Sequence, residues 1–470
     1  MTAHNSTDPL RSERLTFAET QRRRREPHGF PIDRQPHNQP EEQPRPSPPA
    51  PQSHRDAASL QLPMAALHGC AGLAVRTIAP HTEAHPASIL LQLLAAFGNM
   101  VGPGPHCMVD ATRHSLNLFL VLVGDSSKAR KGTSWSQIAR LLAEVDQPWL
   151  SSCVTAARLT AGGLVHTLRD QQPSTDRRLL ALSEEFASVL RPLKSGGGHL
   201  SPLLRCAWDS GYLPALNMSR PVEATGTHIS LIAHITQREL TLNLHSTEAH
   251  NGFANRCLWA WVERSNCLPD GGSLTANDLS PVARELRSAL DWAAATPEIL
   301  FRRDAAAGEL WRDCYPSLSQ VRPGMRGAAT SRAEAQVLRL SAIYAALDCT
   351  PVIALPHLEA ALAVWDYCYA SATLLFGRST GDPIADRIRE AIDGSGGALS
   401  KSQIMRLFHG HIEADRIDAA LETLVVVGAL DVQSQPTGGR PTTRWAAIPS
   451  DQHPNNAESL AEDEEPAEDQ

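Results

Sequence analysis

One short segment of the chain combines glycines, hydroxyl side chains and lysines in the pattern of a phosphate-binding loop. It runs from Gly124 to Ser134 with the sequence Gly-Asp-Ser-Ser-Lys-Ala-Arg-Lys-Gly-Thr-Ser. Backbone N–H groups of such a turn, and of a helix that follows it, can bind phosphate oxygens. Lys131 can neutralise the charge of the β- and γ-phosphates, and the hydroxyl of Thr133 or Ser134 can coordinate Mg²⁺. The expected nucleotide-binding residues are Gly124, Ser126, Ser127, Lys128, Arg130, Lys131, Gly132, Thr133 and Ser134.

The spacing within this loop departs from the standard motif. Lys131 lies seven residues after Gly124 instead of six, and no glycine precedes it. Gly132 also separates the lysine from Thr133. A turn of small residues that only caps a helix is therefore the alternative interpretation.

Two carboxylates, Glu184 and Glu185, follow the apolar run 179–182. One could hold Mg²⁺ through a water ligand, and the other could orient or deprotonate an attacking water. Lys131, Glu184 and Glu185 are the catalytic candidates here, and Glu184 is also a candidate for holding Mg²⁺. Ser183 stands where an aspartate is usual, and paired acids at a helix N-terminus are the alternative.

Further polar residues could complete such a site. His234 and Thr236 lie in and directly after the apolar run 229–235, so either could sense a γ-phosphate. The alternatives are a core histidine and a threonine that caps a helix. Arg256 follows an Asn/Gly-rich turn and could reach a neighbouring subunit's transition state, or form an ordinary salt bridge.

Arg332 and Arg339 lie seven residues apart in a predicted helix, and therefore on one helix face. Either arginine could reach phosphates, with Arg339 as the sensor candidate, or simply charge the helix surface. The histidines and cysteines between residues 228 and 267 match no compact zinc motif. The phosphate-binding loop and the two carboxylates make ATP and Mg²⁺ the expected cofactors.

These residues need a layered fold to bring them together. Residues 116–123 form a short, continuously apolar run, which is typical of a strand buried on both faces. Similar runs at 179–182 and 229–235 alternate with helical stretches, including 87–97 and 135–144. The pattern predicts an α/β core on a parallel sheet over residues 57–275, followed by a helical extension over 276–380. The extension is expected to consist of helices, notably 332–347 and 357–376.

Residues 381–448 form a third unit. Helices are expected over 384–392, 401–408 and 414–427, followed by strands over 429–433 and 442–447 that a Gly-rich turn joins. This order predicts a winged helix, a variant of helix-turn-helix, with DNA contacts from Arg416, Arg440 and Arg444. Basic and acidic side chains are equally frequent over 401–447, so protein docking is the alternative.

Composition limits the other possibilities. The chain has 470 residues and a formal net charge of -8, all of which comes from the acidic stretch 449–470. That stretch and the Pro/Arg-rich residues 1–56 are expected to be disordered. Nine scattered cysteines without a CxxC, and no apolar run long enough to span a bilayer, predict a cytoplasmic protein.

Taken together, several segments resemble the YfjI-type P-loop proteins of phages, prophages and plasmids, an uncharacterised family. The resemblance covers roughly residues 65–377. It is carried, in this order, by residues 129–135, 185–187, 207–209, 228–236, 251–259, 331–335 with 339–340, and 363–367.

The resemblance implies a RecA/AAA-like ATPase core related to replicative helicases. It assigns the phosphate lysine to Lys131, the Mg²⁺ hydroxyl to Thr133 or Ser134, and the catalytic carboxylate to Glu185. The expected function is ATP binding and hydrolysis by a mobile-element protein that acts on nucleic acid, single-stranded DNA above all, in replication. A homo-oligomeric ring and a primase or other replication partner are further expectations. The alternative is a non-catalytic nucleotide sensor or DNA-binding regulator with a degenerate P-loop.

Overall fold

The computed structural model describes residues 60–170, 176–194, 199–215, 222–244, 248, 250–296, 298–377, 379–435 and 442–448. The two terminal segments, 1–56 and 449–470, lie outside the described residues, and so does the Gly-rich turn over 436–441.

A five-stranded parallel sheet forms the centre of the larger body. The strands follow the order β4-β5-β6-β3-β7, and every neighbouring pair is parallel. β3 is buried at every residue because strands flank it on both sides and helices cover both faces, which explains its uninterrupted apolar sequence. The strands are β3 (Phe119–Gly124), β4 (Val154–Thr155), β5 (Arg178–Ser183), β6 (His228–Thr236) and β7 (Cys257–Trp261).

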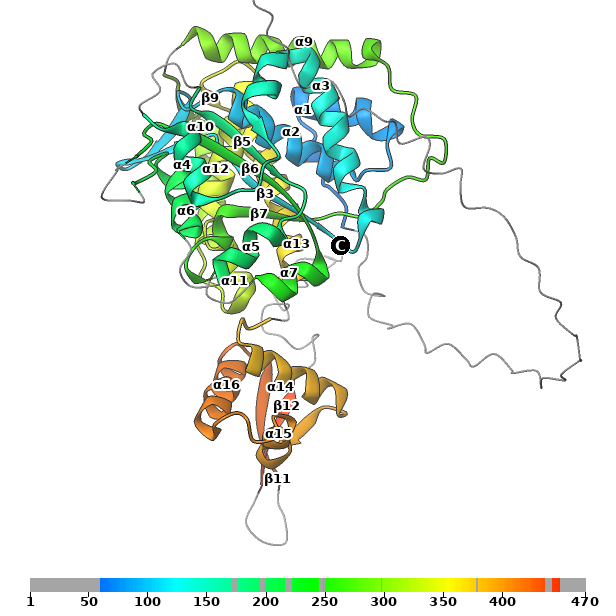
Figure 1. The fold of residues 1–470 in the computed structure, drawn as a ribbon, viewed down its shortest axis with the longest axis vertical. Coiled ribbons are helices and arrows are strands. Elements are labelled where there is room, and N and C mark those ends of the chain that lie inside the picture. The colour runs from blue at the N-terminus through cyan, green and yellow to red at the C-terminus, as the bar shows by residue number, and fades with distance from the viewer. Residues whose placement is uncertain are drawn as a thin grey trace, which may run out of the picture. The chain divides into compact units, whose positions relative to one another are not determined.

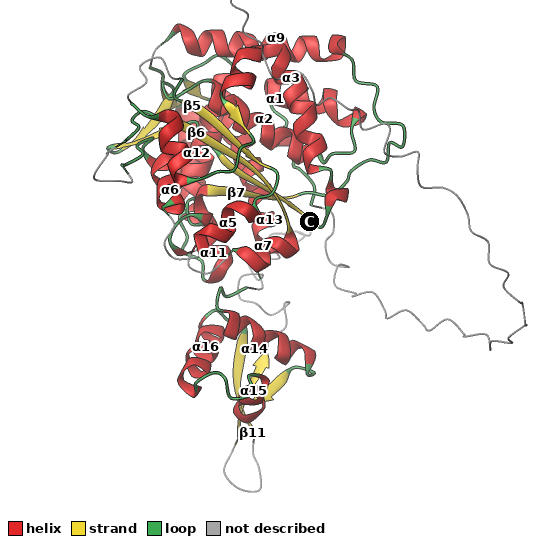
Figure 2. Cartoon of the chain, in the orientation of Figure 1, coloured by secondary structure: helices red, strands yellow, loops and turns green. Residues whose placement is uncertain are grey.

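Helices lie on both faces of this sheet (Figures 1 and 2). Leu120 and Leu122 of β3 belong to one hydrophobic core, whereas Val121 and Val123 belong to another on the opposite face. The first core is built with α1 (Gly69–Ile78), α2 (Pro86–Met100), α3 (Lys131–Ser152) and α9 (Ala276–Ala295). The second is built with α4 (Ala161–Leu168), α5 (Ala187–Lys194), α6 (Leu200–Asp209) and α7 (Gln237–Asn243). The predicted α/β architecture with a parallel sheet is confirmed.

The later helices pack into the same two cores. Residues of α12 and α13 belong to the core beneath α2 and α3, and the end of α13 reaches the other core. These helices are α10 (Ala305–Leu318), α11 (Gly324–Thr330), α12 (Ala333–Leu347) and α13 (Leu355–Phe376). The segment after residue 276 therefore shares its interior with the sheet.

A second sheet corrects the prediction that residues 280–377 are entirely helical. Its order is β2-β1-β8-β9, so it joins an early hairpin to two short strands from the later segment. The strands are β1 (His106–Val109), β2 (Thr112–Ser115), β8 (Leu300–Arg303) and β9 (Val352–Ile353). Strands of two to four residues are too short to interrupt a helical pattern visibly.

The C-terminal unit has three helices, a three-stranded antiparallel sheet of order β10-β12-β11 and a hydrophobic core of its own. A short strand that the sequence did not indicate lies between the first two helices. The elements are α14 (Pro383–Gly394), β10 (Ala398–Ser400), α15 (Lys401–Leu407), α16 (Ala414–Val426), β11 (Leu430–Gln435) and β12 (Thr442–Ala447).

Candidate functional site

The order of the strands makes the end of β3 the place where the sheet can hold a ligand. After β3 the chain crosses to β4 at the far edge, returns through β5 to β6, and then passes β3 to reach β7. The direction of the connections therefore reverses beside β3. In open parallel sheets, ligands bind outside the carboxyl ends of strands at such a switch point. Gly124, the last residue of β3, lies next to Thr236 of β6 at this edge.

The loop that follows β3 is tightly packed. A Cβ atom on Gly124 would lie 2.6 Å from both the Ala129 Cβ and the Val262 carbonyl oxygen, so only glycine fits. Arg130 has a left-handed backbone, with φ of 54°, and its Nε donates a hydrogen bond to Glu83 at 2.6 Å. Leu268 N–H also donates to Glu83, and these bonds hold the pKa of that carboxyl below its usual value. The salt bridge therefore fixes the end of the loop, and the Arg130 side chain is already paired.

Lys131 is the first residue of α3, so the helix begins four residues earlier than predicted. Its side chain is buried, and Nζ donates to the carbonyl oxygens of Ser126, at 3.2 Å, and Gly124, at 3.5 Å. The ammonium group therefore lies over the loop. Burial lowers the pKa of Lys131, while the charges of Glu239 and Asp125 act in the opposite direction.

The start of α3 also leaves backbone donors available. The amides of Lys131, Gly132 and Thr133 have no hydrogen-bond partner among the described residues. A helix leaves its first N–H groups unpaired, and its dipole favours an anion at this end. A Cβ on Gly132 would meet nothing within 4 Å, so the space in front of these amides is open on that side.

The structure distinguishes the two candidate Mg²⁺ hydroxyls. Ser134 is completely buried: its Oγ donates to the Lys131 carbonyl oxygen at 2.7 Å and accepts from Gln92 Nε2 at 2.5 Å. Thr133 is exposed and makes no side-chain hydrogen bond with any described residue. Thr133 is therefore the hydroxyl that is open to a ligand.

The other loop residues have simpler environments. Ser126 Oγ accepts a hydrogen bond from the Lys128 amide at 3.2 Å, and the Lys128 side chain is exposed. Ser127 opens a short 3-10 turn that ends at Ala129, and its side chain lies outside what the structure describes.

The predicted carboxylates lie at the correct edge of the sheet. Glu184 and Glu185 follow the end of β5 and are exposed. β6 separates β5 from β3, so two strand spacings, about 10 Å, lie between β5 and β3. The Phe186 amide donates to the carbonyl oxygen of His234, which ties this acidic turn to β6.

A third carboxylate, that of Glu239, was missed by sequence reasoning. Its charge raises the pKa of Lys131, against the larger effect of burial. Glu239 belongs to the first turn of α7 and forms a capping box with Thr236. Thr236 Oγ1 donates to Glu239 Oε2 at 2.9 Å and accepts from the Glu239 amide at 3.2 Å. Thr236 is therefore a helix cap, one of the two alternatives. The Thr-x-x-Glu spacing is the signal that could have identified Glu239.

His234 is buried on the sheet face that α3 covers. It pairs with Leu122 of β3 in the parallel ladder and is 3% exposed. Its Nε2 has no hydrogen-bond partner among the described residues. Burial, with a smaller contribution from the Lys131 charge, lowers the pKa of His234 to about 4. The imidazole is therefore neutral at neutral pH and retains one unused polar atom.

Arg256 and Arg339 do not reach this site. Arg256 precedes β7 at the opposite edge of the sheet, where it forms an ion pair with Asp209 at 2.5 Å and lies over Trp208. It is 5% exposed, so the ordinary salt bridge replaces the trans-acting role. Arg332 also approaches Asp209, at 3.5 Å, and its guanidinium lies 5.4 Å from the centre of the Trp208 ring.

Arg339 is completely buried at the same edge. Its guanidinium donates to the backbone oxygen and Oδ1 of Asn117, and to the Trp208 carbonyl oxygen at 2.8 Å. Asn117 precedes β3 by two residues, so the whole strand, about 20 Å, separates it from the loop. We therefore assign Arg339 a structural role and no sensor role.

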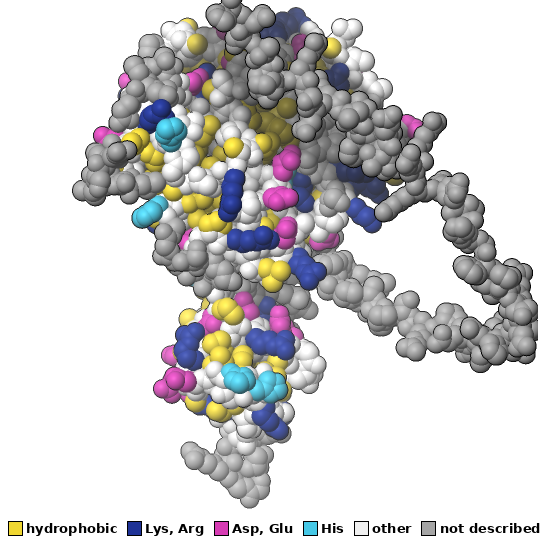
Figure 3. All heavy atoms as spheres, in the orientation of Figure 1, with side chains coloured by type: hydrophobic (Ala, Val, Ile, Leu, Met, Phe, Trp, Pro, Cys, Tyr) yellow, Lys and Arg dark blue, Asp and Glu magenta, His cyan; other side chains and the backbone are white. Residues whose placement is uncertain are grey.

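In the C-terminal unit, Arg416 is exposed on α16. Four exposed acidic residues lie on α16 or directly before it, namely Glu413, Asp415, Asp418 and Glu422. Arg444 donates to the Ala398 carbonyl oxygen at 3.2 Å and is only partly exposed. Arg440 lies outside the described residues. The face shown in Figure 3 carries basic, acidic and histidine side chains together, without dominance of one sign.

His68, Asp348 and His357 have the composition of a metal site, but their facing nitrogen and oxygen atoms already form hydrogen bonds within the protein. Asp348 Oδ2 binds His68 Nε2 at 2.8 Å and His357 Nε2 at 3.1 Å. The Ala354 amide donates to His357 Nδ1, so this nitrogen is unprotonated and Nε2 carries the proton. Both nitrogens of His357 are therefore used. These bonds, first that of His357 and then that of His68, lower the pKa of Asp348.

No protein-family model matches the chain, and no curated protein matches it either. Among the helices that the structure describes, none combines the length and the apolar character needed to cross a membrane.

Proposed function

We propose that the chain binds ATP with Mg²⁺ at the loop between β3 and α3, as a P-loop protein of RecA/AAA-like architecture. One observation carries the proposal: the Lys131 ammonium lies over a loop at the switch point of a parallel sheet, beside unpaired helix amides. A buried ammonium that only carbonyl oxygens bind gains a strong partner when a phosphate enters. The unusual lysine spacing is compatible with this arrangement because α3 begins at the lysine itself.

The described residues divide the work among them. Lys131 Nζ and the first amides of α3 bind phosphate oxygens, and exposed Thr133 offers the hydroxyl for the metal ion. Mg²⁺ neutralises phosphate charge where it is bound. Glu185, with Glu184, prepares the attacking water from the end of β5. The neutral imidazole of His234 lies beneath the loop, where its unused nitrogen can respond to the γ-phosphate.

We further propose that ATP turnover is coupled to nucleic acid, as the resemblance to mobile-element helicase-like proteins implies. The C-terminal unit follows the helix and strand order of a winged helix. Because exposed acidic residues outnumber the single arginine on α16, this unit fits a protein partner better than a phosphate backbone. The competing function is a nucleotide-sensing regulator, which fits the exposure of Glu184 and Glu185, neither of which forms an ion pair with a residue that the structure describes.

Binding of a fluorescent ATP analogue to the full chain tests the proposal. Lys131→Ala should weaken binding at least tenfold, because it removes the buried ammonium group that donates to the loop carbonyl oxygens. Lys401→Ala is the matched control, since this lysine forms an exposed ion pair with Asp418 in the C-terminal unit. Equal affinities of the wild type and Lys131→Ala would refute the nucleotide site.

Phosphate release separates the ATPase from the regulator. If Glu185 prepares water, Glu185→Gln should bind ATP normally and lose about 99% of the release rate, the roughly 10²-fold effect of a lost general base. The rate should also respond to single-stranded DNA. Normal binding without any release by the wild-type protein would favour the regulator.

A further inference from the structure

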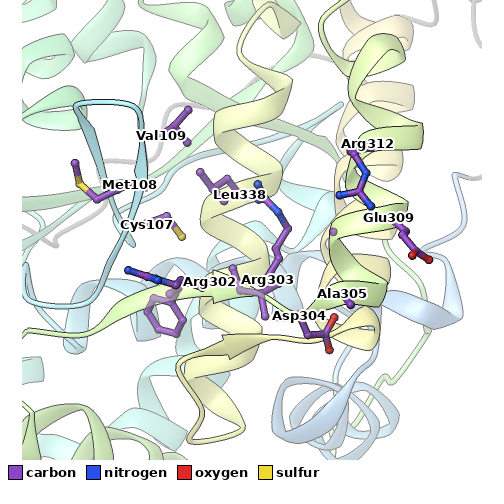
Figure 4. A pocket seen from close by; sticks show the side chains of 13 residues that line it. Cys107, Met108, Val109, Arg302, Arg303, Asp304, Ala305, Glu309, Arg312 and Leu338 are labelled. Carbon is purple, nitrogen blue, oxygen red and sulfur yellow. The ribbon is translucent and has the colours of Figure 1, made fainter.

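A cavity of about 530 Å³ lies between the second sheet and α10, away from the β3 loop. β8 and the residue after it, α10, β1, α12 and β9 all contribute to its lining (Figure 4). Its apolar lining includes Phe301, Leu338 and Ile353, each at most 4% exposed. Met108 and Val109 also line it, and they are 44% and 43% exposed. An apolar group of modest size could therefore move from water onto the exposed apolar side chains of this lining.

The rim of this cavity is cationic. Arg302, Arg303 and Arg312 line it together with two acids, Asp304 and Glu309. None of the three guanidinium groups pairs with a carboxylate in the described part of the chain. Asp304 is already engaged, because it caps α10 by accepting a hydrogen bond from the Ala307 amide at 2.8 Å.

Two of the arginines, Arg303 of β8 and Arg312 of α10, line the cavity from neighbouring elements. Arg303 shares the inner side of β8 with Phe301, and Arg302 lies on the opposite side of the strand. In Figure 4 the Arg303 side chain enters the space between α12 and α10, which Arg312 approaches from α10. The Arg303 guanidinium is 4.5 Å from the centre of the Trp311 ring, which fixes its position.

Gly308 keeps the space in front of Arg312 open. It lies inside α10, where glycine costs about 1 kcal/mol relative to alanine. A Cβ at this position would lie 3.6 Å from Arg312 Nη1, so a larger side chain would occupy the volume that the guanidinium faces. Gly308 therefore lowers the stability of α10 at the position that keeps the cavity accessible.

We propose that this cavity binds a small organic anion, a phosphate or carboxylate joined to a flat apolar group. Arg303 and Arg312 hold the anionic group, since planar guanidinium groups match phosphate and carboxylate oxygens in pairs. The apolar group packs against the exposed side chains of Met108 and Val109. The site is separate from the proposed nucleotide loop and does not depend on it.

Titration calorimetry of the full chain with phenyl phosphate and with benzoate tests the proposal. We expect saturable one-to-one binding of at least one probe, and weaker binding of inorganic phosphate alone, which lacks the ring. The double variant Arg303→Met/Arg312→Met should lose roughly tenfold to hundredfold in affinity, as expected for lost charge-assisted hydrogen bonds. Gly308→Leu should prevent binding by filling the cavity while retaining both arginines.

Two controls separate this cavity from other cationic places. Lys401→Ala should leave the binding of both probes unchanged, because its ammonium forms an exposed ion pair with Asp418 in the C-terminal unit. Arg284→Met, at another cavity of about 580 Å³, should also have no effect. Loss of binding in either control but not in the double variant would overturn the proposal. Absence of saturable binding, or full binding by folded Gly308→Leu, would overturn it as well.

Discussion

At the scale of single residues, polar groups that stabilise the fold can imitate functional ones. Arg339 illustrates this, because it lies seven residues from Arg332 in a helix and carries a charge. α12 is buried over nearly its whole length, so every side of this helix faces the interior. Burial lowers the pKa of the Arg339 guanidinium to about 9. The nearly uniform apolar sequence around it is the signal of a central helix, in which a polar residue must find internal partners.

Arg339→Met should therefore affect stability and not nucleotide affinity. The change leaves the oxygens of Asn117 and Trp208 without donors, which should cost about 2–4 kcal/mol in urea unfolding. The affinity of Arg339→Met for the ATP analogue should stay within about twofold of the wild type, because the Arg339 guanidinium lies a strand length from Gly124. Arg332→Met, at a 36% exposed side chain, should cost less than about 1 kcal/mol. A selective loss of ATP binding in Arg339→Met would restore the sensor role.

The hydrogen-bonded group around Asp348 predicts a dependence of stability on pH. His357 and His68 lower the pKa of this carboxyl, so its folded value lies below the unfolded value of about 4. A carboxyl of this kind adds stability above its unfolded pKa and loses it as the pH falls toward the folded value. Asp348→Asn should cost about 1–3 kcal/mol in urea unfolding at pH 7. The difference from the wild type should shrink below pH 4, and an equal difference at pH 3 would contradict this account.

At the scale of elements, glycines inside helices show where two segments approach closely. The helix predicted over 87–97 stops just before Gly98, yet α2 continues to Met100. A Cβ on Gly98 would lie 2.3 Å from the Leu116 carbonyl oxygen, just before β3. The glycine therefore allows α2 to pack against the chain that enters the central strand.

Gly98→Ala and Gly162→Ala should consequently have opposite effects. The first forces α2 away from a backbone oxygen and should destabilise the protein by about 1–3 kcal/mol, the range of overpacked cores. The second lies in α4 with nothing within 4 Å of its Cβ position, and should stabilise by about 0.5–1 kcal/mol. Thermal unfolding of both variants measures the difference. A neutral Gly98→Ala would mean that α2 can shift freely.

The elements that the sequence predicted correctly are those with a long, one-sided pattern. β3, β5 and β6 each lie within one to three residues of their predicted ends, because a strand buried on both faces is continuously apolar. β8 and β9 escaped prediction because pairing between segments far apart in the sequence creates them: β8 pairs with β1, and β9 pairs with β8. In the candidate site, the positions of Lys131 and Glu185 at one sheet edge could be predicted. The choice of Thr133 over Ser134 depends on contacts with Gln92, which no local pattern contains.

At the scale of the whole molecule, the hydrophobic cores determine which parts of the chain should unfold together. The two cores on the faces of the central sheet share β3 and α13, so we expect residues 60–377 to respond as one cooperative body. The core of the C-terminal unit contains residues from Ala385 to Leu430 and shares none with the others. A unit of this size has only a few kcal/mol of stability from its core. It should therefore respond independently to a single buried substitution.

Leu424→Ala tests this independence. Leu424 is completely buried in α16, and loss of such a side chain costs about 2–5 kcal/mol, a large share of the stability of this unit. Hydrogen exchange measured by mass spectrometry should show faster exchange in α14, α15 and α16, and unchanged exchange in α2 and β3. Val426→Ala on the same helix, at a 76% exposed side chain, should leave both regions unchanged. Faster exchange in β3 after Leu424→Ala would show that the separate cores unfold as one.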